Sequence, residues 1–266
     1  MKTSISIALG CLLAGLWAAA QVRADDFGQT VSRTVGAAGP GIKASLKKVG
    51  TRKPPPPSPV QLTFDANVAQ KYRDQMGRDL AFVNTIQGQG ASKLHQQVYT
   101  LVDGPTYIKW FADRVKSVGY DPKDKDIAYV DVDDDADHSK IWLARGYTKG
   151  RRPQIARVDD VFHEARHTED AYKNWLHVDC PDPYQDAKGK DVVGLGGGKV
   201  AGMRGACDET AFGAYGTAAL MLKNIQRFCG NCSEKVRLDA GLYGDDDVKR
   251  LIGPQAAQDI KADLAQ

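Results

Sequence analysis

Two histidines four residues apart, with a glutamate directly after the first, occupy residues 163–167 of this 266-residue chain. On a helix, residues at i and i+4 lie one above the other, so the imidazoles of His163 and His167 can reach one metal ion. Glu164 would then lie beside a water molecule held by that ion. Zinc binds neutral imidazole and leaves one position for water, whose proton a glutamate can accept. The spacing therefore predicts a zinc site with its own general base.

The surrounding residues support a helical setting for this pattern. The chain has five histidines and only four glutamates, so chance alone would produce the pattern in about one such sequence in a thousand. Apolar residues recur at helical spacing over residues 153–177, and both histidines lie on the opposite face together with Asp170. We interpret Asp170 as a carboxylate that orients a ligand imidazole by hydrogen bonding.

The segment HEARH resembles the HExxH zincin superfamily of metallopeptidases, and the resemblance extends over residues 155–216. The third zinc ligand distinguishes the branches of this superfamily. The metzincin pattern is excluded because Lys173 occupies the position of its third ligand. The gluzincin branch takes a glutamate from a downstream helix, and the resemblance implies Glu209 as that ligand beside the two histidines.

Asp208 is the alternative third ligand, because GACDETAFG resembles the aspzincin pattern with one residue too many. If Glu209 is the ligand, Asp208 is expected beside the metal site as a supporting carboxylate. A zincin also needs a group that stabilises the oxyanion of the tetrahedral intermediate. The candidates are Tyr215, His177, Arg204 and Tyr243, of which Tyr215 is preferred. Glu169 is assigned no catalytic role, because it lies towards the apolar side of the predicted helix.

Four cysteines follow the N-terminal segment, and an even number in an exported protein predicts two disulfides. A helix over residues 209–228 would separate Cys207 and Cys229 by roughly 30 Å. That distance is far beyond the reach of a disulfide. The remaining pairing joins Cys180 to Cys207 and Cys229 to Cys232.

The N-terminal part of the chain reads as export and linker sequence. Residues 1–24 contain a lysine, an apolar run and a small-residue cleavage site, which is typical of a secretory signal peptide. Residues 25–62 are basic and rich in proline, which favours a solvated linker over a weak tether to an anionic envelope. We therefore expect a periplasmic or extracellular protein whose zincin-like domain spans residues 63–266. No later segment is apolar enough to cross a membrane, and the net charge of +3 indicates no nucleic-acid partner.

The remaining patterns predict a mainly helical α+β domain. Helices are expected over residues 65–83, 91–102 and 105–118, and strands over 127–132 and 141–147 form a small β-hairpin before the metal helix. The zincin resemblance implies that such a strand aligns an extended substrate.

The turn of this hairpin carries alternate aspartates, Asp131, Asp133, Asp135 and Asp137. Their spacing lacks the glycine and the terminal glutamate of a calcium-binding EF-hand loop. A solvated acidic turn is therefore favoured over a Ca²⁺ site.

Together these patterns predict an exported zinc metallopeptidase that hydrolyses peptide bonds in a peptide or protein substrate. Two alternatives stay open. The chain could be a catalytically inactive zincin-like protein with a binding or structural role, or a hydrolase of a cell-wall amide. A cleft that reaches Glu164 and an open zinc position would favour an enzyme, whereas a buried site with four protein ligands would exclude one.

Overall fold

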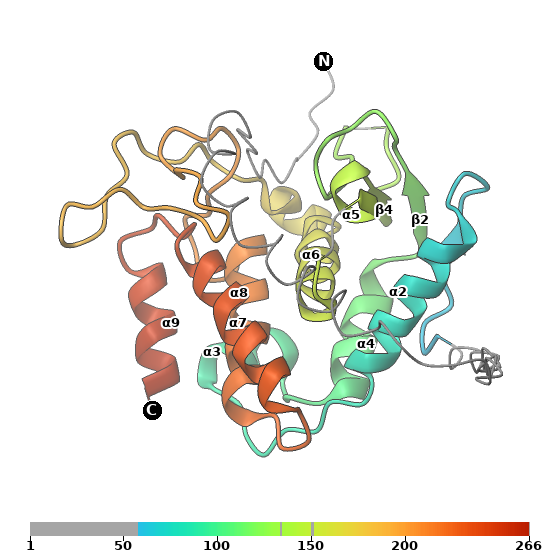
Figure 1. Cartoon of the computed structure of the whole chain (residues 1–266), viewed down its shortest axis with the longest axis horizontal. Coiled ribbons are helices and arrows are strands. Elements are labelled where there is room, and N and C mark those ends of the chain that lie inside the picture. Colours follow the sequence, from blue (N-terminus) through green and yellow to red (C-terminus); the bar gives the residue numbers. More distant parts are fainter. Residues whose placement is uncertain (1–57, 134, 150–151, 266) are drawn as a thin grey trace, which may run out of the picture. The chain divides into compact units, whose positions relative to one another are not determined.

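The computed structural model describes residues 58–133, 135–149 and 152–265. The predicted signal peptide and nearly all of the predicted arm lie outside the described residues. The described chain contains helices and a small sheet, which confirms the α+β expectation (Figure 1). Its elements are β1 (Thr63–Phe64), α2 (Gln70–Val83), α3 (Lys93–Tyr99), α4 (Gly104–Arg114), β2 (Ser117–Tyr120), β3 (Ala128–Val130), β4 (Lys140–Leu143), α5 (Arg145–Lys149), α6 (Gln154–His167), the 3-10 segment η1 (Asp170–Trp175), α7 (Ala214–Phe228), α8 (Glu234–Val248) and α9 (Ala256–Ala265).

The predicted hairpin is part of a larger mixed sheet. Strands β3 and β4 pair antiparallel, and β4, β2 and β1 continue the sheet through parallel pairing in the order β1-β2-β4-β3. The helix predicted over residues 105–118 is wrong at its end. Helix α4 ends at Arg114, and Val118 lies in the extended strand β2. A side chain at Gly119 would lie 2.5 Å from the Trp142 ring, so this strand position requires glycine.

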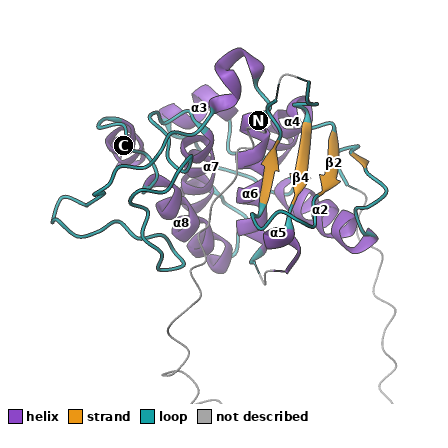
Figure 2. Ribbon diagram, turned by 90° about the horizontal axis from the view of Figure 1, so that it is seen from above, coloured by secondary structure: helices purple, strands orange, loops and turns teal. Residues whose placement is uncertain are grey.

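Helix α6 lies between two groups of elements. Figures 1 and 2 show α7 and α8 on one side of it and the sheet with α2 and α4 on the other. Nearly every residue from Ile155 to His167 is buried. On the sheet side, Phe162 packs against Trp110 and Phe111, with ring centroids 5.8 Å and 5.2 Å away. This packing fixes the helix that carries the HExxH pattern.

The metal helix ends earlier than its sequence pattern predicts. It stops at His167 instead of continuing to residue 177, because the backbone leaves the helical conformation at Glu169 (φ −91°, ψ 91°). Lys173, Asn174 and Trp175 then adopt positive φ angles of 52°, 55° and 49°, which turn the chain further. The Asn174 side-chain amide donates to the carbonyl of His167 at 2.9 Å, which satisfies an open group at the helix end. The chain therefore turns back, and His177 returns towards the helix instead of continuing along it.

Two disulfides have the predicted pairing, Cys180 with Cys207 and Cys229 with Cys232. Such bonds persist in oxidising compartments. The second follows directly after α7. The first joins the segment after η1 to the segment before α7, and Val178 and Cys207 form an antiparallel bridge beside it. In the described part of the chain, no helix combines the length and apolar character needed to cross a membrane.

Candidate metal centre

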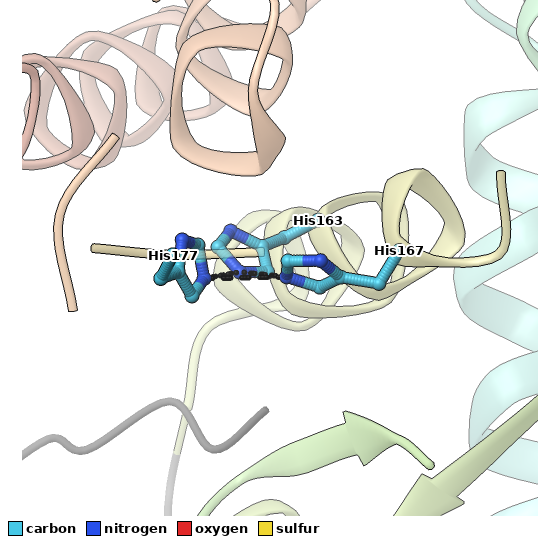
Figure 3. Close-up of side chains that lie close together, drawn as sticks. All are labelled: His163, His167 and His177. Carbon is cyan, nitrogen blue, oxygen red and sulfur yellow. Dashed lines mark hydrogen bonds between the residues drawn. The ribbon is translucent and has the colours of Figure 1, made fainter. Parts of the chain in front are cut away.

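Three histidine side chains point their Nε2 atoms towards one another. The Nε2 atoms of His163, His167 and His177 lie 3.1 to 3.3 Å apart in each of the three pairs, as Figure 3 shows. The first two rings come from consecutive turns of α6, and the third comes from the chain that follows η1. This is the group of potential metal ligands found in the described residues.

The hydrogen bonds of two rings show why these nitrogens cannot satisfy one another. The Nδ1 atom of His167 lies 2.7 Å from the backbone carbonyl of Asn174, and Nδ1 of His177 lies 2.6 Å from Oδ1 of Asp208. Both partners only accept, so each Nδ1 must carry the proton and each Nε2 of the neutral ring presents a lone pair. Lone pairs that face one another at this distance could hold a shared cation.

The distances fit zinc. Nitrogens bound at about 2.0 to 2.1 Å to a tetrahedral zinc ion lie about 3.3 Å from one another, which is close to the observed separations. Burial lowers the pKa of His163 and His167 well below the usual value, and the neighbouring histidines lower it further. The rings are therefore neutral at physiological pH, which is the form that binds a metal.

The third histidine is positioned by tertiary structure. The backbone amides of Val178 and Cys207 each donate to the other residue's carbonyl, at 2.8 and 3.0 Å. The Cys180–Cys207 disulfide closes the same pair of segments. As a result His177 and Asp208, the residues next to this bridged pair, lie side by side.

Asp208 supports the site through both carboxylate oxygens. Oδ1 accepts from His177, while Oδ2 accepts the backbone amide of Tyr215 at 2.8 Å, at the start of α7. A side chain at Gly213 would lie 2.4 Å from Oδ2, so glycine is needed there. With both oxygens engaged, Asp208 orients an imidazole and caps a helix, and does not point at the metal position.

Glu209, the expected third ligand, is not brought to the histidines. Asp208 forms a parallel bridge with Leu251, so its segment is extended and successive side chains point to opposite sides. Because Asp208 points at His177, Glu209 points away; it is exposed and lines a separate hollow. His177 stands in the third position in its place.

Other residues singled out by the sequence have supporting or separate positions. Asp170 pairs with His138 and accepts a hydrogen bond from the Asn174 side chain. It therefore touches Asn174, the hydrogen-bond partner of His167, and none of the three converging imidazoles. Glu169 binds Arg114 and Arg166, in agreement with a structural role.

The hairpin aspartates do not form a metal-binding group in the described residues, where Asp137 instead accepts from the backbone and hydroxyl of Ser139. Arg204 is 92% exposed and lies outside the site.

Glu164 is completely buried next to the first ligand. Neither carboxylate oxygen makes a hydrogen bond of normal geometry in the described part of the chain. Burial raises the pKa of Glu164 well above its usual value, with contributions from Asp160 and Asp126 and an opposing contact with the backbone of Val130 in β3. A carboxyl group with a raised pKa is suited to accept and then release a proton near neutral pH.

Tyr215 lies against two of the histidines. Its ring centroid is 4.4 Å from that of His163 and 4.7 Å from that of His177. The hydroxyl is buried without a hydrogen-bond partner in the described residues, and burial raises the pKa of this phenol. The group therefore stays protonated and able to donate.

A cleft of about 270 Å³ opens onto this side of the site, and His163, Tyr215 and Tyr243 are among its lining residues. The cleft thus reaches the group of three histidines at His163, while Glu164 is not among the cleft's lining residues in the described part of the chain. The sequence suggests His177 only as a candidate oxyanion donor. The ten-residue spacing from His167 to His177 is visible in the sequence, but the predicted continuous helix would carry His177 away from His167.

Comparison with protein-family models, curated proteins and solved structures finds no match for this chain.

Proposed function

We propose that this protein is a zinc-dependent hydrolase that cleaves peptide bonds outside the cytoplasm, with His163, His167 and His177 as the zinc ligands. The observation that carries the proposal is the convergence of three imidazole Nε2 atoms at mutual distances of 3.1 to 3.3 Å. Three protein ligands leave the fourth tetrahedral position for water, which distinguishes catalytic zinc sites from closed structural ones.

The residues around this position suit hydrolysis. When bound, zinc would supply a Lewis acid that activates water and polarises the carbonyl group of the substrate. Glu164 would accept a proton from the water as its oxygen bonds to the carbonyl carbon. The same carboxyl group would then deliver that proton to the leaving nitrogen as the C–N bond breaks. Its burial and raised pKa support both steps.

The Tyr215 hydroxyl is the proposed donor to the oxyanion. It is buried, protonated and unpartnered in the described residues, and its ring touches two ligand imidazoles. A donor fixed before the reaction stabilises developing negative charge without reorganisation. Arg250 lies over the Tyr215 ring at 4.9 Å and adds positive charge to this wall.

The setting also suits an extended substrate. Strand β3 is at the edge of the sheet and packs against α6. An edge strand can bind an extended peptide through backbone hydrogen bonds. The two disulfides are typical of an oxidising compartment, which supports the export that the N-terminal sequence predicts.

The test is hydrolysis of a mixture of unstructured peptides by the zinc-loaded protein, with new termini identified by mass spectrometry. The account expects cleavage that a chelator abolishes and added zinc restores. Glu164→Gln should keep zinc but lose at least about a hundredfold in rate, because it removes the proton acceptor. Glu234→Gln, an exposed change of the same type at the start of α8, should leave the rate unchanged.

Cleavage that survives in Glu164→Gln would contradict the assigned base. Zinc binding without cleavage of any peptide would favour an inactive binding protein.

A further inference from the structure

The cleft beside the metal centre is rich in carboxylates. Four aspartates line it, Asp159 and Asp160 from α6 and Asp246 and Asp247 from α8. Asp159 precedes His163 by four residues, so it lies on the same helix face about 6 Å along the axis. The acidic wall and a zinc ligand therefore belong to one continuous surface.

Two of these aspartates already have cationic partners. Arg152 binds both oxygens of Asp160 at 2.7 and 2.8 Å. Lys249 lies 3.2 Å from Asp246. The other arginine in the cleft wall, Arg250, donates to the backbone carbonyl of Ala206 at 3.1 Å and stacks over Tyr215. Among the described residues, neither of the remaining two carboxylates forms an ion pair with a lysine, arginine or histidine.

The two remaining carboxyl groups, those of Asp159 and Asp247, lie next to each other in the cleft. Their side chains lie within hydrogen-bonding reach of each other, and the residues are only 8% and 7% exposed. Asp159 Oδ1 and Asp247 Oδ2 still lack a hydrogen-bond partner in the described part of the chain. Two buried carboxyl groups that contact each other without a cationic partner destabilise a protein when ionised, so such a pair suits a ligand that brings positive charge.

We propose that this cleft is a subsite for a cationic group of the substrate, an ammonium or guanidinium, and that Asp159 and Asp247 select it. The inference rests on the hydrolytic function proposed above and names a preference of the same site. Such a group could come from a lysine or arginine side chain or from a free α-amino group near the cleaved bond. The formal charge favours either source, since the four aspartates of the cleft outnumber their cationic neighbours Arg152, Arg250 and Lys249 by one.

Four small hydroxamates separate the possibilities when titrated by calorimetry into the zinc-loaded protein. The hydroxamate group binds zinc in every probe, so binding itself reports the metal site. The probes are the hydroxamates of lysine and of norleucine, each with a free or an acetylated α-amino group. Norleucine has the same chain length as lysine without its charge.

If a side chain fills the subsite, the lysine hydroxamate with an acetylated α-amino group should bind about tenfold more tightly than the norleucine hydroxamate with the same acetyl group. If an α-amino group fills it, the free norleucine probe should exceed its acetylated form by about the same factor. In either case the advantage should fall as salt rises. Equal affinity of all four probes would overturn the subsite while leaving the metal site in place. Failure of all four to bind would overturn the proposed function, and the subsite with it.

Asp247→Asn tests the assignment of the residue, because it replaces one ionisable carboxyl group by a neutral amide of nearly the same shape. The affinity ratio between charged and uncharged probes should drop towards one. Asp245→Asn is the matched control, since Asp245 lies on the same helix, pairs with Lys223 and is 65% exposed in its side chain. An unchanged ratio in Asp247→Asn would contradict the proposal. If that variant does not fold, the four-probe comparison on the unaltered protein still decides.

Discussion

The two halves of the metal centre are held by different kinds of structure. His163 and His167 are fixed by the backbone of α6, where a spacing of four residues brings both rings to one face. His177 has no regular element around it, and depends on the turn after α6, the Val178–Cys207 bridge and the carboxylate of Asp208. The helix-held pair thus persists as long as α6 does, whereas the loop-held ligand can be disturbed through several separate contacts.

Because the two halves are held differently, substitutions should weaken metal binding in two different ways. In the helix-held half, the His167 tautomer is fixed by the backbone carbonyl of Asn174, which stays present whatever side chain stands at that position. In the loop-held half, a supporting side chain and a disulfide act on the ligand from a distance. Variants in the two halves should therefore differ in how far from the metal they exert an effect.

Loss of a helix-held ligand should have the largest effect. In His167→Ala, two nitrogens remain, and zinc affinity should fall by more than roughly a hundredfold, beyond the loss typical of supporting residues. Competition with a fluorescent chelator measures this. His138→Ala is the matched control, since the His138 ring binds Asp170 and the backbone of Asp133 and is not part of the three-histidine group. Comparable zinc loss in both variants would contradict the site.

Loss of the loop-held support should come next. Asp208→Asn removes the charge beside His177 while keeping an oxygen that can cap α7, so zinc affinity should fall about 10- to 100-fold without unfolding. Asp170→Asn should change affinity less than about twofold, because Asp170 does not touch a ligand ring. The same competition assay ranks the two, and an equal loss would place Asp170 beside Asp208 in importance.

The disulfides sharpen the comparison further. Serine at both Cys180 and Cys207 opens a loop with a sequence separation of 27, which should cost about 3 to 4 kcal/mol of unfolding free energy in the chain-entropy model. It should also weaken zinc binding, because the bridge beside His177 is loosened.

Serine at both Cys229 and Cys232 opens a loop with a separation of only 3 and should cost about 2 kcal/mol with zinc affinity unchanged. Denaturant unfolding and zinc titration check both double variants. Zinc affinity that responds equally to the two disulfides would remove the special role of the first.

The smallest expected effect is a change of stability with pH. It concerns Asp159, which lies on the helix of the helix-held pair, and its neighbour Asp247 on α8. Burial and the neighbouring carboxylates raise the pKa of Asp159 to about 7 and that of Asp247 well above its usual value. The native state therefore holds protons that the unfolded state loses above about pH 4, so stability falls as pH rises from about 4 to 7.

Asp247→Asn removes this penalty. Denaturant unfolding of the metal-free proteins measures the difference in unfolding free energy between the variant and the unaltered protein. This difference should favour the variant by at least about 1 kcal/mol more at pH 8 than at pH 5. A gain that is independent of pH would show that the pair does not titrate as described.

The sequence predicts the helix-held half far better than the loop-held half. Helical spacing alone placed His163, Glu164 and His167 together, and the reach of a disulfide was enough to pair the cysteines. The continuation to His177 failed because side-chain periodicity does not report the positive φ angles at Lys173, Asn174 and Trp175. Tertiary bridging, which points Asp208 inwards and Glu209 outwards, leaves no local pattern either.

The sheet shows the same limit. The hairpin of β3 and β4 was readable from local alternation, whereas the parallel neighbours β1 and β2 come from distant segments. Short strands of two and four residues carry little pattern of their own. The stretch after α4 also fits helical spacing, and its extended form comes from pairing with β1 and β4, where Gly119 lies opposite Trp142.

The most direct test of the account is the zinc content of the purified protein beside two variants, His177→Ala and Glu209→Ala. Elemental analysis after removal of loosely bound metal should find one zinc per chain in the unaltered protein. The account predicts that His177→Ala loses it and Glu209→Ala keeps it. Zinc retained in His177→Ala and lost in Glu209→Ala would contradict the three-histidine centre and restore the glutamate as third ligand.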